Sequence, residues 1–255
     1  MIRIDYHVHT VFSDGKNTAR EMAEAALALG MTELGFSDHA PMPIPQDWAI
    51  RPERLREYLR TVQALAAEYR GRLSIRCGLE QDYFSDPLPE EINYVIGSCH
   101  YIFQDGCYLP VDESPKVLLA GCREHFGGNF YRMAAAYYAL EGRCAEKTKA
   151  DIIGHFDLIT KFNEGEALFS ESDPRYIRAA TEAVDRLLTA GVPFEINTGA
   201  ISRGYRTAPY PSRPLREYIR ARGGRFILSS DSHARETLCY GFDALSDEAG
   251  LLPAL

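Results

Sequence analysis

The amino-acid sequence predicts an α/β fold, a barrel of parallel strands, and three observations lead to it. Short apolar runs alternate with longer segments of helical periodicity, the pattern of repeated βα units. The chain has 255 residues, a length that one α/β barrel commonly fills. Polar side chains, including six of the seven histidines, follow the apolar runs. We therefore expect a single domain over residues 1–255.

Seven apolar runs are the predicted strands, since each is short, rich in aliphatic residues and bounded by polar residues. In order they are Ile2–Tyr6, Glu33–Phe36, Leu73–Leu79, Tyr94–Gly97, Asp151–Ile153, Pro193–Ile196 and Arg225–Leu228.

Five segments between the strands are predicted helices because their apolar residues recur at helical spacing. They are Thr18–Leu29, Arg54–Tyr69, Asn129–Arg143, Arg175–Ala190 and Arg213–Ala221. Thr18 and Glu21 form the pattern of a capping box, and Gly30 stands where a helix commonly ends. Two long segments, Ala40–Pro52 and Gln104–Gly128, show only weak periodicity, and we expect loops there that are functional or locally folded.

The composition excludes several classes of protein. The formal net charge is −8, and no basic stripe indicates a nucleic-acid partner. No apolar stretch is long enough to span a membrane, and the polar N-terminus is unlike a signal peptide. We expect a cytoplasmic, soluble protein. Its six cysteines form no CxxC pair and should be reduced. The oligomeric state is not indicated.

Polar side chains, most of them ionisable, follow every predicted strand. Because the carboxyl ends of the strands of a parallel barrel share one face, these groups should converge on one site. In strand order they are His7 and His9, Asp38 and His39, Glu80 and Asp82, His100, His155, Asn197, and finally Asp231 and His233.

Eight of these groups, together with Asp14 of the first loop, are nine potential metal ligands. His7 and His9 alternate in an extended segment, so both imidazoles face one side. Nine ligands exceed the four of one tetrahedral ion and suit two or three divalent ions that share a carboxylate. The alternative, an imidazole cluster without cations, would place repelling protonatable groups together. The nine are His7, His9, Asp14, His39, Glu80, His100, His155, Asp231 and His233.

The chain resembles the polymerase and histidinol phosphatase (PHP) superfamily in motifs that run from residue 2 to about residue 243. They are YHVHTVFSDG, FSDHAPMP, GLEQDYF with VIGSCHYI, ADIIGHFDLI, EINTGAISRGY and LSSDSHA. The segments SDHAPMP, VIGSCHY and GHFDLITKF are most similar to the histidinol-phosphate phosphatase branch. The resemblance implies a distorted (β/α)7, TIM-like barrel.

The resemblance also implies how the ligands are shared among three ions. The first ion would be held by His7, His9, Glu80 and Asp231, the second by Glu80, His100 and His155, and the third by Asp14, His39 and His233. Some relatives carry histidine at the position of Asp14, although aspartate is usual there in the histidinol-phosphatase branch. The departure implies a third site that is weaker or differently selective. Many relatives also continue beyond the last motif, so a trimmed barrel edge near residue 255 is an alternative. Zinc, iron or manganese would suit these ligands.

Such a site predicts hydrolytic phosphoryl transfer by a metal-bound hydroxide. Asp231 or His233 would protonate the leaving oxygen. Arg203 is the first candidate for binding the phosphate, ahead of Lys161. Asn197 is a further phosphate-binding candidate. Arg206 and Arg235 compete with the first two cations for the same role. Losing Arg203 should lower kcat/KM and leave the metal content unchanged.

The resemblance implies L-histidinol phosphate, an intermediate of histidine biosynthesis, as the substrate. The residues available for its imidazole and ammonium groups are Asp38, Asp82, Tyr83, Tyr101 and Phe162. Asp38 and Asp157 would instead suit support of neighbouring imidazoles, and Trp48 could cover the mouth. One alternative is a phosphoesterase acting on nucleotides or another small phosphomonoester, and a second is a metal-binding barrel without catalysis.

Overall fold

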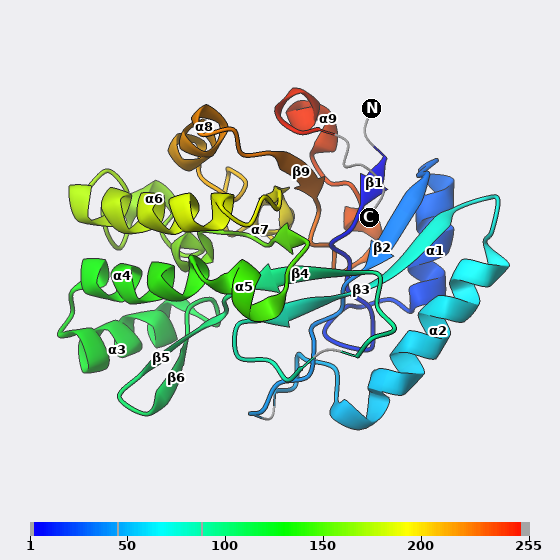
Figure 1. Ribbon diagram of the computed structural model, residues 1–255, viewed down its shortest axis with the longest axis horizontal. Coiled ribbons are helices and arrows are strands. Elements are labelled where there is room, and N and C mark those ends of the chain that lie inside the picture. Colours follow the sequence, from blue (N-terminus) through cyan, green and yellow to red (C-terminus); the bar gives the residue numbers. More distant parts are fainter. Residues whose placement is uncertain (1–2, 45, 88, 251–255) are drawn as a thin grey trace.

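Seven parallel strands form the centre of the molecule (Figure 1). The computed structural model describes residues 3–44, 46–87 and 89–250. The sheet order is β1-β2-β3-β4-β7-β8-β9, so each barrel strand pairs with its neighbours in the chain. The strands are β1 (Ile4–Asp5), β2 (Glu33–Phe36), β3 (Ser74–Asp82), β4 (Tyr94–Ser98), β7 (Ile152–Ile153), β8 (Phe194–Asn197) and β9 (Phe226–Ser229).

The sheet closes into a barrel just beyond the ends of β1 and β9. Val8 forms a parallel bridge with Ser232. The His9 amide donates to the Ser232 carbonyl at 2.9 Å, and the Ser232 amide donates to the His7 carbonyl at 3.0 Å. The segment that carries two predicted ligands is therefore tied directly to the segment that carries Asp231. Residues 251–255, where a trimmed edge was an alternative, lie outside the described residues.

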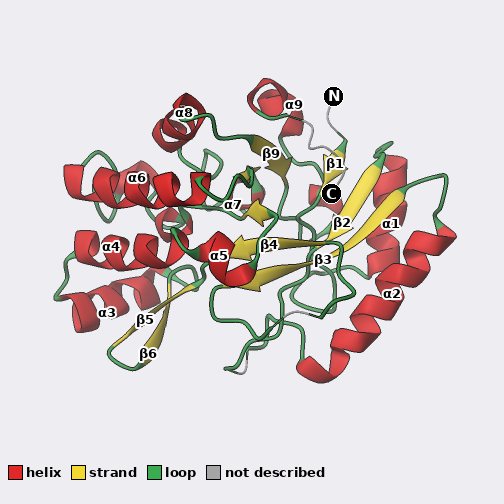
Figure 2. Ribbon diagram, viewed as in Figure 1, coloured by secondary structure: helices red, strands yellow, loops and turns green. Residues whose placement is uncertain are grey.

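The helices lie outside the strands (Figure 2). Helices α3, α4 and α6 pack side by side on one flank, and α1 and α2 cover β2 and β3 on the other. The helices are α1 (Ala19–Ala28), α2 (Leu55–Glu68), α3 (Pro115–Phe126), α4 (Phe130–Glu141), α5 (Cys144–Thr148), α6 (Pro174–Leu188), α7 (Gly199–Ser202), α8 (Arg213–Ala221) and α9 (Phe242–Leu245). Within the described ranges, no helix is both long and apolar enough to cross a membrane.

The seven-stranded α/β barrel and the five expected helices are confirmed, with ends that move by a few residues. Thr18 caps α1 through the predicted capping box with Glu21, and Gly30 takes φ +68° directly after the C-cap. Strand β3 continues to Asp82, so Glu80 and Asp82 lie inside the strand rather than after it. Ile2 of the first predicted strand lies outside the described residues.

The segment Gln104–Gly128, expected as a functional or locally folded loop, is locally folded into elements that were not predicted individually. This segment contains α3 and most of a hairpin, made by β5 (Tyr101–Gln104) and β6 (Cys107–Pro110). Asp105 and Gly106 form its two-residue turn with φ of +51° and +80°, the conformation that Asp-Gly favours between antiparallel strands. The short helices α5, α7 and α9 were also not predicted, because one turn carries too little periodicity to be recognised.

A tyrosine fills the barrel below the polar end. The Tyr94 hydroxyl donates to the carbonyls of Tyr6 at 2.6 Å and Phe36 at 3.0 Å. A Cβ atom at Gly35 or Gly78 would overlap with this side chain, so both positions need glycine. The packed interior makes the barrel a closed support, and the polar strand ends are held above it.

Candidate metal centre

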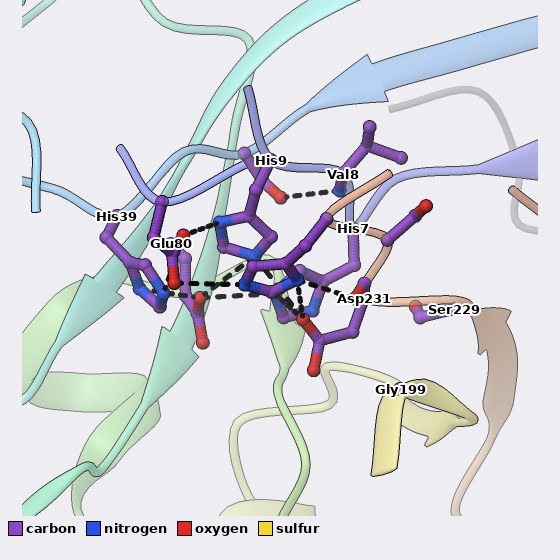
Figure 3. Close-up of polar contacts among 12 residues, drawn as sticks. His7, Val8, His9, His39, Glu80, Gly199, Ser229 and Asp231 are labelled. Atoms are coloured by element: carbon purple, nitrogen blue, oxygen red, sulfur yellow. Dashed lines mark hydrogen bonds and ion pairs between the residues drawn. The ribbon is translucent and has the colours of Figure 1, made fainter. Parts of the chain in front are cut away.

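The predicted ligands converge on one face of the barrel. His7, His9, His39, Glu80 and Asp231 point toward one another from four segments of chain (Figure 3). All nine predicted ligands belong to this cluster. Each of the six imidazoles has a ring nitrogen 2.8–3.8 Å from an oxygen of at least one of the three carboxylates. We call this set of nine residues the carboxylate–imidazole cluster.

Glu80 lies at the centre of the cluster. Its Oε1 atom is 2.8 Å from His155 Nε2 and 3.5 Å from His100 Nε2. Its Oε2 atom is 2.9 Å from His39 Nδ1 and 3.2 Å from His7 Nε2. Two oxygens of one carboxylate thus face different sets of imidazoles, which is the arrangement that a bridging ligand requires.

The donor atoms divide into smaller groups of the size that one cation binds. Within each group the atoms lie no more than 4.8 Å apart. With metal–ligand bonds of about 2.0–2.2 Å, the ligand atoms of a tetrahedral ion stand about 3.3–3.6 Å apart. The groups are His7, His9 and Asp231; His9, Asp14, His39 and His233; His7, Glu80 and His155; and His39, Glu80 and His100.

Buried polar atoms without partners support cation binding at this cluster. Among the described residues, His7 Nε2, both ring nitrogens of His9 and Glu80 Oε2 have no hydrogen-bond partner. Leaving such atoms dry and unpaired costs about 1–3 kcal/mol each. Coordination to cations would satisfy His7 Nε2, Glu80 Oε2 and one ring nitrogen of His9, because a neutral imidazole has only one nitrogen with a free lone pair. The residues therefore fit the ions that their chemistry indicates.

The charges of the cluster set the protonation states of its carboxylates and imidazoles. Burial alone would raise the pKa of Glu80, but the charges of His39, His7 and His100 hold it well below its usual range. Burial would likewise raise the pKa of Asp231, and Arg203 and His7 hold it well below the ordinary value. Burial, together with the charges of His233 and His39, lowers the pKa of His9 to about 3. Ionised carboxylates and a neutral His9 are forms that bind cations. Against the lowering effect of burial, the carboxylates raise the pKa of His7, His39 and His100, so bound cations would displace protons from these three imidazoles.

Two carboxylates behind the cluster orient its imidazoles. Glu195 Oε1 lies 2.7 Å from His7 Nδ1, and Asp82 Oδ2 lies 3.2 Å from His100 Nδ1. Glu195 was missed by the sequence analysis, although a charged residue inside the apolar strand β8 was a signal for it. The side-chain amide of Asn197 donates to Glu195 Oε2 at 3.0 Å, and Asn197 is fully buried. Asn197 therefore lies behind the cluster and not along the cavity.

Arg203 reaches the cluster from the end of α7. Its guanidinium donates to Asp231 Oδ2 at 2.9 Å and to the Asp231 carbonyl at 2.8 Å, and it lies 2.9 Å from His233 Nδ1. A Cβ atom at Gly199 would overlap with both Asp231 and Arg203, so this pairing needs glycine. Asp231 has φ +49°, an uncommon conformation that clusters at functional sites.

The cluster opens into a cavity of about 420 Å³. Its lining combines site carboxylates and imidazoles with two cations, three further acids and several aromatic rings. Trp48 stacks on Tyr101 and meets His39 edge-on at 4.7 Å, so it covers part of the mouth. Besides seven of the nine cluster residues, the lining includes Asp47, Trp48, Tyr101, Asp112, Glu113, Lys161, Arg203, Tyr205 and Tyr210.

Two of the predicted phosphate-binding cations face the cavity, and each is paired with a different acidic residue. Arg203 is bonded to Asp231, as described above. Lys161 donates to the Asp112 carbonyl at 2.8 Å and to its carboxylate at 3.1 Å, and its ammonium lies 4.9 Å from the centre of the Tyr205 ring. Both cations line the cavity, and each is already held by an acidic residue.

Other candidates lie away from the cavity lining. Arg206 is buried against Thr160, and Arg235 pairs with Glu236 at the surface. The expected support of imidazoles by Asp38 and Asp157 is not found. Asp38 instead accepts hydrogen bonds from Thr10 and Ser13, and Asp157 accepts one from the Ser212 amide. For Asp38, adjacency to His39 in sequence was misleading, because neighbours in extended chain point to opposite sides. Asp82, Tyr83 and Phe162 are likewise not among the lining residues.

Comparison with known proteins gives a consistent result. The family model described as "PHP domain" matches residues 5–199. A probable histidinol-phosphatase from Deinococcus radiodurans is 35% identical over 90% of this chain and 85% of its own length. A histidinol-phosphatase from Bacillus subtilis is 28% identical over 96% of this chain and 98% of its own.

Two solved structures share the fold. A candidate histidinol phosphatase from Listeria monocytogenes superposes with a TM-score of 0.81 at 19% identity, over 94% of this chain and 99% of that one. Histidinol phosphate phosphatase from Lactococcus lactis, solved with zinc, L-histidinol and phosphate, gives a TM-score of 0.69 at 19% identity, over 97% and 94% of the two chains. Together with the sequence matches, the geometry shows that the chain belongs to the PHP family, in its histidinol-phosphatase branch.

Proposed function

We propose that this protein hydrolyses L-histidinol phosphate to L-histidinol and phosphate. The observation that carries the proposal is the carboxylate–imidazole cluster, which opens into a cavity lined by both cationic and acidic side chains. Curated relatives named histidinol-phosphatase support the substrate, as does the related structure with L-histidinol and phosphate. Histidine biosynthesis, a cytoplasmic location and the absence of a nucleic-acid partner follow from this proposal and stay predictions.

The nine residues of the cluster would hold two or three divalent ions, with zinc, iron or manganese suited to the mixed ligands. Bound ions would supply a hydroxide nucleophile at neutral pH, because they lower the pKa of coordinated water toward about 7, and they would draw charge from the phosphate oxygens. Glu80 would be shared between ions, since its two oxygens face separate imidazoles. Glu195 and Asp82 keep His7 and His100 turned toward the cluster.

The cavity lining suggests how the substrate is oriented. Arg203 stands beside Asp231 at the cluster and would bind the phosphate oxygens. Lys161 lies further along the wall, paired with Asp112, and would add positive charge at the phosphate end. Asp47 and Glu113 line the same cavity and would attract the ammonium and imidazole of the substrate.

The leaving oxygen needs a proton, because an alkoxide is a poor leaving group. Of the two candidates, His233 is the more accessible, with 19% of its side chain exposed against 6% for Asp231. The Asp231 carboxylate is also held by Arg203. We therefore assign the proton transfer to His233 ahead of Asp231, in a state in which the donating nitrogen of His233 binds no ion.

The test is phosphate release from L-histidinol phosphate, p-nitrophenyl phosphate and a mononucleotide, with protein whose metal content has been measured. We expect the largest kcat/KM for L-histidinol phosphate, loss of activity on chelation, and recovery on adding zinc or manganese. A metal-loaded protein that prefers the mononucleotide would replace this substrate with a nucleotide. A metal-loaded protein inactive on all three esters would refute the proposed phosphatase activity.

A further inference from the structure

A second group of metal-type ligands lies in the core, outside the carboxylate–imidazole cluster. Cys99 directly follows β4, Glu141 is the last residue of α4, and Cys144 is the first residue of α5. Their donor atoms lie within 4.8 Å of one another. All three residues are at most 1% exposed.

Glu141 is the unusual member of this group. In the part of the chain that the structure describes, neither of its carboxyl oxygens has a hydrogen-bond partner. Its surroundings belong to the main hydrophobic core, which includes Met133 and Tyr137 of the same helix. Burial raises the pKa of the Glu141 carboxyl to about 8. Such a group is costly to bury, so its retention in this core calls for a partner.

We propose that Cys99, Glu141 and Cys144 bind one zinc ion that is separate from the ions of the proposed active site. Thiolate sulfur and carboxylate oxygen are both ligands of zinc, and buried sites rich in cysteine are typical of structural zinc. Two thiolates, one carboxylate and a divalent ion leave the site with a single negative charge. Zinc sites of two cysteines and two histidines are neutral, and zinc sites of four cysteines carry two negative charges. The net charge of the proposed site lies between these two values. Binding would release the two thiol protons and the carboxyl proton into solution.

The spacing is compatible with one ion. With Zn–S bonds of about 2.3 Å, two sulfurs of a tetrahedral site stand about 3.8 Å apart. The present upper limit of 4.8 Å between donor atoms therefore requires a contraction of about 1 Å at most. Three protein ligands would leave the fourth position to water or a backbone carbonyl.

The position of this site suggests what the ion would do. It would join the end of β4 to the junction between α4 and α5. Cys99 precedes His100, which belongs to the carboxylate–imidazole cluster. The ion would thus be structural, and it would fix the chain beside one predicted active-site ligand without touching the substrate cavity.

Cobalt substitution distinguishes the two kinds of site, because the nine cluster residues include no sulfur ligand. Protein would be produced in zinc-depleted medium supplemented with Co²⁺, and its near-ultraviolet absorption and cobalt content measured. Thiolate ligands give an intense charge-transfer absorption there, which imidazole and carboxylate do not. We expect this absorption in the wild-type protein, at a strength corresponding to one thiolate-bound ion per chain.

Three variants locate the ion. Cys99→Ser combined with Cys144→Ser should remove the absorption and one ion per chain. Cys122→Ser, a change at another buried cysteine, should keep both. Glu80→Gln should lose ions from the carboxylate–imidazole cluster and keep the thiolate absorption, so failure of the proposed active site would not be confused with failure of this one.

The proposal is overturned if cobalt-loaded wild-type protein lacks the charge-transfer absorption. It is also overturned if the double serine variant keeps the same metal content. A third contradicting result is a disulfide, seen as four rather than six thiols titrating after denaturation, since the chain has six cysteines. Should the double variant fail to fold, the spectrum and thiol count of the wild-type protein still decide.

Discussion

Replacing Glu80 by glutamine tests the structural account at its centre. The substitution keeps the size of the side chain and removes its negative charge. Glu80 faces His155 with one oxygen, at 2.8 Å, and His39 with the other, at 2.9 Å. A glutamine amide offers only one oxygen, and its NH2 group would point hydrogens at an imidazole nitrogen. The change should therefore weaken binding of every ion that Glu80 shares.

The expected magnitude follows from the number of ions affected. Losing a residue that only orients a metal ligand costs about 10- to 100-fold in affinity or activity. Loss of a direct ligand should cost at least as much for each ion. If two ions are both needed, kcat/KM should fall by about 10²- to 10⁴-fold, or roughly 3–5 kcal/mol of transition-state stabilisation.

The assay measures metal content and phosphate release on the same preparation of Glu80→Gln protein. Circular dichroism should stay unchanged, because the side-chain volume is kept and Ser98 can still donate its 2.7 Å hydrogen bond to the remaining oxygen. Glu124→Gln, at an exposed position on α3, is the matched control and should behave as wild type. A Glu80→Gln protein with wild-type metal content and activity would refute the bridging role.

Further predictions concern the supports of the cluster and of the barrel. Glu195→Gln should lower metal affinity about 10- to 100-fold in a chelator competition, because His7 loses the charged partner of its Nδ1 atom; unchanged affinity would remove Glu195 from the site. Arg203→Lys should lower kcat/KM about 10- to 100-fold, and unchanged kinetics would transfer phosphate binding to another cation. Gly78→Ala should destabilise the fold by about 1–3 kcal/mol in urea unfolding, because its methyl group overlaps with Tyr94; equal stability would contradict the packing described for the barrel interior.

The structure changes one expectation about Arg203. From the sequence, Arg203 acts on phosphate alone, and its loss leaves the metal content intact. In the structure it donates to both the carboxylate and the carbonyl of Asp231. Arg203→Ala should therefore lower metal content as well as kcat/KM. Equal metal content in Arg203→Ala and wild-type protein would restore the simpler role.

The sequence was a good guide where a residue's role depends on its position along a strand. A parallel barrel places all carboxyl strand ends on one face, so residues as distant as His7 and His233 could be brought together without knowledge of side-chain packing. The seven strands were predicted from the short apolar runs, and the sheet keeps them in chain order. What the rule required was only the location of each strand and the polar group that follows it.

The sequence was a poor guide to contacts made behind and beside the cluster. The orienting role of Glu195 depends on which way β8 faces, and Asp38 lies next to His39 in sequence but bonds to the Thr10 loop instead. The β5–β6 hairpin was missed although its Asp105-Gly106 pair is a recognisable turn signal. The segment from Gln104 was instead interpreted as a loop because of its weak periodicity. These features are set by side-chain orientation and local turn geometry.

The most direct test of the proposed function is a metal titration of chelator-treated protein, with phosphate release from L-histidinol phosphate measured at each addition. We expect no activity in protein without ions in the carboxylate–imidazole cluster, and activity that rises until at least two zinc or manganese ions per chain are bound there. Full phosphatase activity in protein shown to lack those ions would contradict the account.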